Sequence, residues 1–108
     1  MKIVSCNLNG IRSAHRKGFF DWYRKQRCDV LCIQELKAQE DQIDTESMFP
    51  KNVYSYFKCA EKKGYSGVAL LCKSEPDHVE FGTGIDYMDH EGRNIRADFG
   101  DLSVMSMY

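Results

Sequence analysis

The sequence predicts an α/β protein in which helices cover one side of a mixed β-sheet, and three observations predict this class. A strand pattern at 2–8, an amphipathic helix pattern at 17–27 and a second strand pattern at 29–35 form a strand–helix–strand opening. Short strand patterns joined by short turns follow, as in an antiparallel meander. With 43% apolar residues and two prolines, the 108 residues can pack a core. The chain is therefore one domain at most, or part of one.

The first strand and the helix that follows it are defined by local signals. The strand at 2–8 ends at Asn9-Gly10, a dipeptide that forms turns. The helix at 17–27 places apolar and aromatic side chains at helical spacing on one face: Phe19, Phe20 and Tyr23, with Trp22 nearby. We therefore expect this helix to pack against the sheet.

The later elements are shorter. The strand at 29–35 opens with a continuous apolar run, which is typical of a strand buried on both faces. A short helix is expected near 40–49, stopped by Pro50. Five further strands are expected, at 53–59, 67–73, 78–82, 94–99 and 102–108. The link between 94–99 and 102–108 has hairpin length, which implies an antiparallel pair.

Cysteine usage and hydropathy indicate the compartment. The five cysteines form no CxxC pair, and three of them lie inside apolar runs: Cys6, Cys32 and Cys72. They are typical of small buried hydrophobic residues in a reducing compartment rather than of disulfides or a zinc site. The opening "MKIVSCNLNG" lacks the apolar core of a signal peptide, and no apolar run approaches membrane-spanning length. We therefore expect a cytoplasmic protein with no membrane partner.

The net charge of −1 conceals an uneven distribution. Residues 1–37 hold eight Lys or Arg and three Asp or Glu, so this part has a net charge of +5, whereas the remainder has −6. A basic loop, "IRSAHRKG", contributes Arg12, Arg16 and Lys17. Such a cluster can neutralise a phosphodiester backbone, or it can simply be a solvated surface. Phosphate-bearing partners therefore remain compatible with the sequence.

Polar side chains end both apolar strands. Asn7 and Asn9 lie at the end of the first strand, and Gln34 and Glu35 end the strand at 29–35. If these strands are parallel neighbours, their carboxyl ends share the sheet edge where α/β proteins place their sites. One carboxylate with amide oxygens suits Mg²⁺, which keeps several waters. The alternative is that the asparagines are turn residues and that the strand simply emerges at the surface.

Two further motifs have both a functional and a structural interpretation. In "KKGYSGVALL", glycines flank Tyr65-Ser66, so backbone amides could approach a phosphate, or the segment could be an ordinary turn before a buried strand. In "DHEGRN", we expect Glu91 and Arg93 to form a structural ion pair. His15, His78 and His90 have no joint metal spacing, and we assign them no role.

Five ordered blocks together resemble a known family. They are "SCNLNGIRSA" (5–14), "DVLCIQELK" (29–37), "KGYSGVALL" (63–71), "EGR" (91–93) and "SVMSMY" (103–108). Their order and spacing resemble the amino-terminal part of the exonuclease III family of apurinic/apyrimidinic (AP) endonucleases. This family belongs to the endonuclease/exonuclease/phosphatase superfamily, with deoxyribonuclease I-like nucleases and inositol-polyphosphate 5-phosphatases. The resemblance implies a two-sheet α/β sandwich of deoxyribonuclease I type, with a mixed sheet and flanking helices.

The resemblance implies a metal site. Glu35 matches the ligand of the catalytic Mg²⁺ or Mn²⁺, and Asn7 matches the residue that supports this metal and its hydrogen-bond network. Asn9 and Lys37 fall beside the metal, and we place both among the DNA-binding residues. Tyr108 matches the tyrosine set against the scissile phosphate, where a phenol can donate a hydrogen bond or act as a phenolate.

The resemblance also implies the substrate. Arg12 matches an arginine that contacts DNA phosphate, and Gly64 and Tyr65 lie in a loop that enters the minor groove. The implied reaction is hydrolysis of the phosphodiester 5′ to an abasic site in double-stranded DNA, with 3′-phosphodiesterase or 3′–5′ exonuclease activity in many members. The family enzyme is expected to be a monomer when full length.

The chain also departs from the family pattern. The family's catalytic domain is well over twice this length, and its "GDxN" and "SDH" blocks, which supply the residues near the attacking water, are missing here. We therefore expect residues 1–108 to be the amino-terminal part of a single domain, inactive alone and with an apolar face exposed for lack of a second sheet. The alternatives are a DNA-binding-only module and a metal-dependent phosphatase of the same superfamily.

Overall fold

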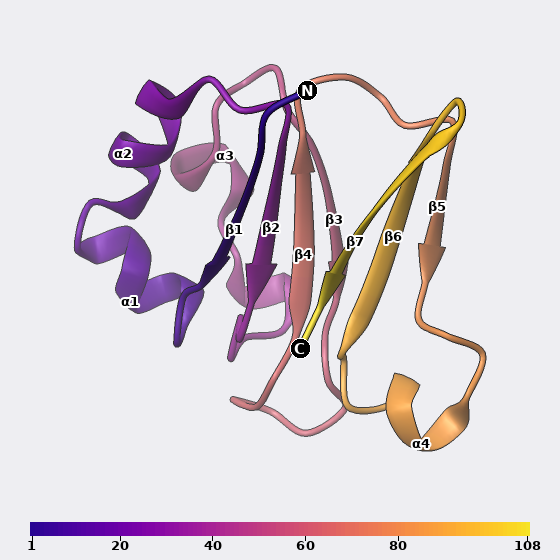
Figure 1. Cartoon of the computed structure of the whole chain (residues 1–108). Coiled ribbons are helices and arrows are strands. Elements are labelled where there is room, and N and C mark those ends of the chain that lie inside the picture. Colours follow the sequence, from indigo (N-terminus) through magenta and orange to yellow (C-terminus); the bar gives the residue numbers. More distant parts are fainter.

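The computed structural model describes residues 1–108 and contains two β-sheets (Figure 1). The first sheet has the strand order β1-β2-β4-β3. Its strands are β1 (Ile3–Asn7), β2 (Val30–Gln34), β3 (Tyr54–Lys58) and β4 (Val68–Cys72). β1 and β2 are parallel, with Asn7 opposite Gln34, whereas β4 is antiparallel to both of its neighbours. The predicted mixed sheet is therefore confirmed.

The second sheet is antiparallel and has the order β5-β6-β7. Its strands are β5 (His78–Phe81), β6 (Asn94–Phe99) and β7 (Leu102–Met107). β6 and β7 form the hairpin that the short link predicted, with Phe99 opposite Leu102. The meander therefore leaves the first sheet after β4 and builds a separate layer.

Helices cover the outer face of the first sheet (Figure 1). They are α1 (Ile11–Arg16), α2 (Phe19–Gln26), the 3₁₀ helix η1 (Glu40–Gln42) and α3 (Thr45–Met48). The interpretation of "IRSAHRKG" as a loop is wrong, because α1 occupies most of it. Ile11 is fully buried and its N–H donates to the Leu36 carbonyl at 2.9 Å, so burial of one side chain anchors this short helix. A further short helix, α4 (Asp86–Asp89), lies between β5 and β6 and was not predicted.

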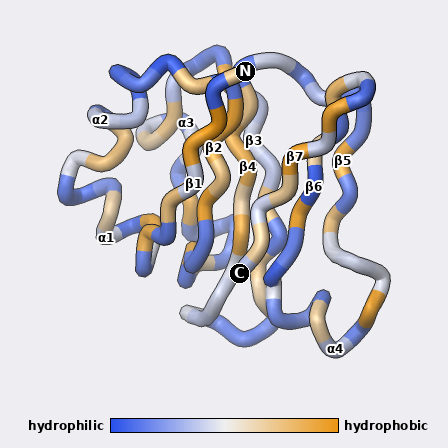
Figure 2. The backbone as a smooth tube through the Cα atoms, in the orientation of Figure 1, coloured by the Kyte–Doolittle hydropathy of each residue, from blue (hydrophilic) through white to orange (hydrophobic).

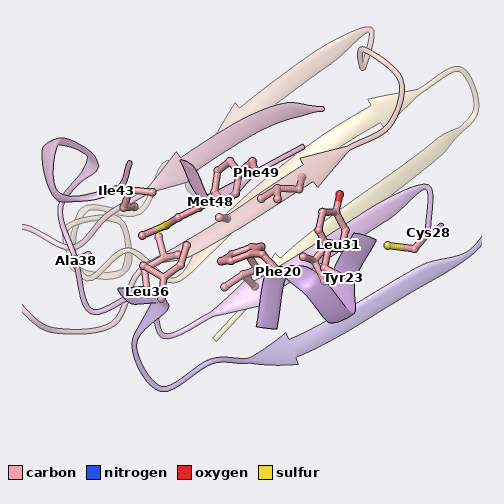
Figure 3. Packing of buried hydrophobic residues seen from close by; sticks show 13 residues of the cluster. Phe20, Tyr23, Cys28, Leu31, Leu36, Ala38, Ile43, Met48 and Phe49 are labelled. Atoms are coloured by element: carbon pink, nitrogen blue, oxygen red, sulfur yellow. The ribbon is translucent and has the colours of Figure 1, made fainter. Parts of the chain in front are cut away.

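The larger of two hydrophobic clusters lies between the helices and the first sheet. Phe20 and Tyr23 of α2 belong to the same cluster as Leu31 of β2 and Phe49, which follows α3 (Figure 3). The rings of Phe20 and Phe49 lie with their centroids 5.1 Å apart. The predicted aromatic face of the second helix is therefore the face that packs on the sheet.

The second cluster lies between the two sheets. Its members are Val30, Cys32, Val68, Leu70, Cys72, Ile95, Ala97 and Val104. β2 and β4 are thus buried on both faces, as the continuous apolar runs predicted. The expectation that the strands from 53 onward lack a second sheet is wrong, because β5, β6 and β7 supply one within this chain.

Apolar side chains remain exposed on the unpaired outer strands. β1 pairs only with β2, and β7 pairs only with β6, so each leaves one edge open. Ile3 of β1 and Met105 and Met107 of β7 are between 43% and 58% exposed. Figure 2 shows that apolar residues otherwise concentrate in the central strands, whereas the connecting loops are largely hydrophilic. Other exposed apolar side chains lie on α2, on β3 and around β5 and α4: Trp22, Tyr54, Phe81, Ile85 and Tyr87.

The cysteines and the helices bear on the compartment. All five cysteines are free thiols; Cys28, Cys32 and Cys72 are buried, and Cys6 and Cys59 are half-buried. The interpretation of Cys32 and Cys72 as small buried hydrophobic residues is confirmed. No helix combines the length and the apolar content that crossing a membrane would require.

Candidate metal and phosphate site at the strand ends

The carboxyl ends of β1, β2 and β7 lie at the same end of the molecule (Figure 1). Asn7 ends β1, Glu35 directly follows β2, and Tyr108 directly follows β7. The parallel pairing of β1 with β2, predicted as a condition for this site, is therefore present. The contact between the two sheets then adds Tyr108, which lies 73 positions further along the chain.

Glu35 is the centre of the cluster. The Asn7 side-chain Nδ2 donates to Glu35 Oε1 at 2.8 Å. This hydrogen bond is the main reason why the pKa of Glu35 is lowered, and hydrogen bonding from Tyr108 and the charge of Lys37 act in the same direction. The carboxylate is therefore ionised at neutral pH, although its side chain is only 19% exposed.

Lys37 and Asn9 complete a ring of polar contacts. Lys37 Nζ lies 2.5 Å from Asn9 Oδ1 and 3.5 Å from Glu35 Oε2. The Asn9 backbone N–H donates to Asn7 Oδ1 at 2.9 Å. Arg12, on α1, donates from Nη2 to the Lys37 carbonyl at 3.1 Å. Lys37 therefore lies beside the carboxylate, and Arg12 contacts the backbone of the same segment, so two cations lie in this region, as a phosphate-binding site requires.

The backbone is held in an unusual conformation around this cluster. Five residues other than glycine have a positive φ, and four of them belong to the site and its neighbouring loop: Asn9, Glu35, Lys37 and Ser66. A left-handed conformation costs such residues about 1–3 kcal/mol each, so the surrounding contacts must impose it. Backbone hydrogen bonds do so: Gly10 N–H donates to the Glu35 carbonyl at 2.8 Å, and Lys37 N–H donates to the Ser66 carbonyl at 2.9 Å.

The two glycines in the loop before β4, Gly64 and Gly67, have different surroundings. A Cβ atom on Gly67 would lie 3.0 Å from the Leu36 side chain, so glycine permits the close packing of the two loops. Gly64 is exposed, and a Cβ there would meet nothing within 4 Å. The turn interpretation therefore applies to Gly67, whereas Gly64 is exposed at the tip and the neighbouring Tyr65 is half-buried.

The predicted ion pair between Glu91 and Arg93 is confirmed, with Arg93 Nε 3.0 Å from Glu91 Oε1. The same guanidinium also donates from Nη2 to the Tyr65 hydroxyl at 2.8 Å and from Nη1 to the Tyr108 carbonyl at 3.2 Å. Sequence reasoning missed these two contacts. The "EGR" block was the signal for Arg93, but its spacing says nothing about which distant residues it touches.

The Tyr108 side chain is 44% exposed and faces Glu35. Its pKa is raised, first by partial desolvation and then by its hydrogen bond to the Glu35 carboxylate. The phenol is therefore neutral in this structure. Of the two forms considered for it, the hydrogen-bond donor fits this environment and the phenolate does not.

The donor set has the chemistry that a hard divalent cation prefers. No three His, Cys, Asp or Glu side chains lie together as a metal cluster, which argues against a site for a soft transition metal. Glu35 supplies one carboxylate, and the Oδ1 atoms of Asn7 and Asn9 each retain a lone pair beyond the hydrogen bond described above. One carboxylate with amide oxygens and water is a suitable set for Mg²⁺.

The three histidines lie outside this cluster. His78 pairs with Glu80 at 2.7 Å, His90 Nδ1 contacts the Asp86 carbonyl at 2.6 Å, and His15 packs beside Phe20. None of them contacts Asn7, Glu35 or Tyr108. The cluster around Glu35 therefore contains no imidazole.

Comparison with known proteins identifies the class. Residues 4–106 match the Endonuclease/Exonuclease/phosphatase family, so the chain belongs to this family. Within the family it is of the exonuclease III and AP endonuclease type, as the following relatives indicate. The chain is 39% identical to the exodeoxyribonuclease of Bacillus subtilis and 42% identical to the DNA repair nuclease APEX1 of Danio rerio. Both alignments cover 100% of this chain, but only 42% and 36% of the relatives.

Solved structures agree with this assignment. An AP endonuclease from Archaeoglobus fulgidus superposes with a TM-score of 0.84 at 30% identity, over 100% of this chain and 40% of that one. The catalytic domain of Xenopus laevis APE2 gives a TM-score of 0.77 at 30% identity and is covered to 45%. The deoxyribonuclease I-like fold class is therefore confirmed, and the chain spans less than half the length of these proteins.

Proposed function

We propose that the protein is a metal-dependent DNA-repair endonuclease that hydrolyses the phosphodiester 5′ to an abasic site in double-stranded DNA. The observation that carries this proposal is the ionised Glu35 carboxylate, held by Asn7 and Tyr108 beside the Lys37 ammonium, with Arg12 bound to the Lys37 carbonyl. The printed names of the relatives, an exodeoxyribonuclease and a DNA repair nuclease, support the same reaction class.

Glu35 would hold Mg²⁺ or Mn²⁺, with the amide oxygens of Asn7 and Asn9 beside it. When bound, such an ion neutralises charge that develops on the phosphate and the leaving oxygen. The Tyr108 phenol, which its raised pKa keeps protonated, would turn its single O–H from Glu35 to a phosphate oxygen. Lys37 would then be displaced from Glu35 towards the substrate phosphate, where its charge remains useful.

DNA would lie across the loops at this end of the molecule. Arg12 uses one N–H on the Lys37 carbonyl, so its other donors can reach a backbone phosphate. Gly64 is exposed at the tip of its loop, and Tyr65 offers a ring beside it. The resemblance assigns this pair to the minor groove, and the exposure of Gly64 supports that assignment.

Residues 1–108 would form the amino-terminal part of a single catalytic domain. The share of each relative that they cover, between 30% and 42% for three curated relatives, supports this proposal. The side chains that contact Glu35 are those of Asn7, Lys37 and Tyr108, and none is an imidazole or a second carboxylate that could deprotonate water, so we assign that step to the remainder of the domain. The complete protein would be a monomer in the cytoplasm, where free thiols persist.

Activity at 3′ ends is a second proposed function. A protein from Neisseria meningitidis described as a 3′–5′ exonuclease superposes with a TM-score of 0.84 at 26% identity. A variant of the same Neisseria protein, bound to a product DNA hairpin, is described as a 3′ phosphatase. The same metal and phosphate ligands would serve at a strand terminus. A binding-only module would not need an ionised carboxylate beside DNA, and this disfavours that alternative.

The test is an incision assay on the longer polypeptide that contains residues 1–108. An end-labelled duplex with one abasic site is incubated with MgCl₂, MnCl₂ or EDTA, next to an undamaged duplex and a soluble inositol phosphate. We expect a single cut 5′ to the abasic site, leaving a 3′-hydroxyl, only when metal is present. Release of phosphate from the soluble ester without DNA cleavage would instead identify a phosphatase.

A further inference from the structure

Arg93 connects three parts of the molecule that are far apart in the sequence. Its guanidinium donates to Glu91 Oε1 at 3.0 Å, to the Tyr65 hydroxyl at 2.8 Å and to the Tyr108 carbonyl at 3.2 Å. It also lies 5.2 Å from the centroid of the Tyr108 ring. The Tyr108 backbone N–H donates in turn to the Arg93 carbonyl at 2.9 Å. Tyr108 is thus held by Arg93 at both its backbone and its ring.

We propose that Arg93 is a positioning residue, which fixes the Tyr108 phenol against Glu35 and ties it to the Tyr65 loop. This inference rests on the proposed endonuclease function. Because the Arg93 guanidinium contacts both tyrosines, a movement of Tyr65 in its loop is passed through this planar group to Tyr108. Binding of DNA at the loop and alignment of the phosphate-site phenol are therefore linked.

The geometry requires arginine rather than a generic cation. A guanidinium is planar and carries five N–H donors in a fixed fork, and here three separate acceptors use three of its donor directions. A lysine has one terminal nitrogen and could not reach Glu91, Tyr65 and Tyr108 together. Glu91 orients the fork and also accepts from the Tyr65 hydroxyl at 3.2 Å.

The surroundings of Arg93 distinguish positioning from a direct DNA contact. The Arg93 side chain is 28% exposed, and three of its N–H donors are used within the protein. A residue that binds phosphate directly would contribute to affinity and to its salt dependence. A residue that acts through Tyr108 would instead change the rate of the bound complex.

Arg96 provides a matched control on the same strand. It forms an ion pair with Asp98, with N–O distances of 2.9 and 3.1 Å, in the same two-residue spacing that joins Arg93 to Glu91. It contacts neither Tyr65 nor Tyr108. Arg96→Ala therefore removes an equivalent charge and an equivalent ion pair without touching the site.

The experiment measures kcat and KM on an abasic-site duplex, with every variant made in the longer polypeptide. The variants are Arg93→Ala, Arg93→Lys, Arg96→Ala, Tyr108→Phe and the double variant Arg93→Ala/Tyr108→Phe. For Arg93→Ala and Arg93→Lys we expect kcat to fall by about 10²-fold, as for a misplaced reacting group, with KM and the salt slope of binding unchanged. Arg96→Ala should keep the wild-type kcat. In the Tyr108→Phe background, Arg93→Ala should cost little more, because it acts through the missing hydroxyl.

Three outcomes would overturn the inference. A loss confined to KM, with a salt slope reduced by about one, would make Arg93 a direct phosphate contact. Additive losses in the double variant would show that Arg93 does not act through Tyr108, and equal effects of Arg93→Ala and Arg96→Ala would leave only a structural ion pair. If the Arg93→Ala variant does not fold, Tyr65→Phe serves in its place, because it removes only the hydroxyl that Arg93 contacts. The inference then requires that Tyr65→Phe lowers kcat and leaves KM unchanged. Absence of incision by the wild-type protein would instead contradict the proposed function itself.

Discussion

Gln34 Nε2 donates a hydrogen bond to Ser106 Oγ at 3.0 Å, and this contact joins the two sheets directly behind the site. Ser106 Oγ in turn donates to the Ile33 carbonyl at 2.9 Å. Gln34 immediately precedes Glu35, and Ser106 lies two residues before Tyr108. Together with the apolar cluster between the sheets, the two hydrogen bonds therefore help to hold β2 against β7, and with them the carboxylate and the phenol.

Removal of the Ser106 hydroxyl should destabilise the protein. Ser106 is 1% exposed, so Ser106→Ala leaves the Gln34 amide without one of its partners in a region that water cannot easily reach. We expect a loss of about 1–3 kcal/mol in the free energy of unfolding, measured by urea denaturation. Ser74→Ala, at an exposed position, is the control and should leave the urea midpoint unchanged. Equal midpoints for both variants would show that the sheets do not depend on this bond.

Glu35→Gln should abolish Mg²⁺-dependent cleavage and leave the fold intact. The substitution keeps the size of the side chain and its contact with Asn7, but it removes the charge that a divalent cation needs. Cleavage of an abasic-site duplex and the far-ultraviolet circular dichroism spectrum are measured together. Glu80→Gln, on an exposed position of β5, should retain full activity. Undiminished turnover by Glu35→Gln would make Glu35 a surface residue at the end of a strand.

Arg12→Ala should weaken DNA binding to a similar extent for all sequences. A single phosphate contact accounts for about one unit of the slope of log K against log salt, so the slope should fall by about one. The slope is measured by fluorescence anisotropy between 50 and 200 mM salt. Over this range, proteins with many phosphate contacts lose ~10³–10⁵-fold in DNA affinity. Lys25→Ala removes the same charge from an exposed position on α2 and should keep the slope. An unchanged slope for Arg12→Ala would return α1 to the solvated-surface interpretation.

Asp89 should make stability depend on pH in the acid range. Its carboxylate accepts from the Thr83 N–H at 2.7 Å, from the Thr83 hydroxyl at 3.0 Å and from the Gly84 N–H at 2.9 Å, and these bonds lower its pKa below the usual 3.8. The pKa of Asp89 is lower in the folded protein than in the unfolded chain. The ionised carboxylate therefore stabilises the fold fully above about pH 4, and this stabilisation is lost as pH falls through the lowered pKa.

The measurement is the urea midpoint of wild type and Asp89→Asn from pH 7 down to pH 2. We expect the wild type to be more stable at pH 7 and the difference to narrow once Asp89 is protonated. Asp101→Asn, at an exposed position, should follow the wild type throughout. A difference that stays constant with pH would show that the Asp89 charge does not stabilise the turn at Thr83.

Residues 1–108 alone should neither cleave an abasic-site duplex nor stay monomeric. General-base assistance is worth ~10²–10⁴-fold, and none of the side chains that contact Glu35, those of Asn7, Lys37 and Tyr108, is a carboxylate or imidazole that could provide it. The open edges of β1 and β7, with exposed Ile3, Met105 and Met107, favour association. Mass in solution and incision are measured on the isolated chain, with the longer polypeptide as the active control. Robust incision by a monomer would contradict both arguments.

Local signals account for most of what could be predicted. The strands at 29–35 and 67–73 were recognisable because continuous apolar runs are typical of strands buried on both faces. In the structure, β2 and β4 are indeed buried on both faces. Glu35 was recognisable because a carboxylate directly after such a run needs a special environment. The basic segment after β1 was misinterpreted because a six-residue helix has too few turns for a periodic signal, and burial of Ile11 alone anchors it.

By itself, the sequence determined the succession of strands along the chain and the place of Asn7 and Glu35 at two strand ends, because each depends on neighbouring residues, whereas the parallel pairing of β1 with β2 was only a condition that the structure met. Only the tertiary structure decided that the meander forms a second sheet and that β7 brings Tyr108 to Glu35. It also decided the role of Arg93, whose contacts with Tyr65 and Tyr108 span 28 and 15 residues. Such contacts leave no periodic trace in a sequence, because they arise from the packing of whole sheets and loops rather than from the spacing of side chains along one element.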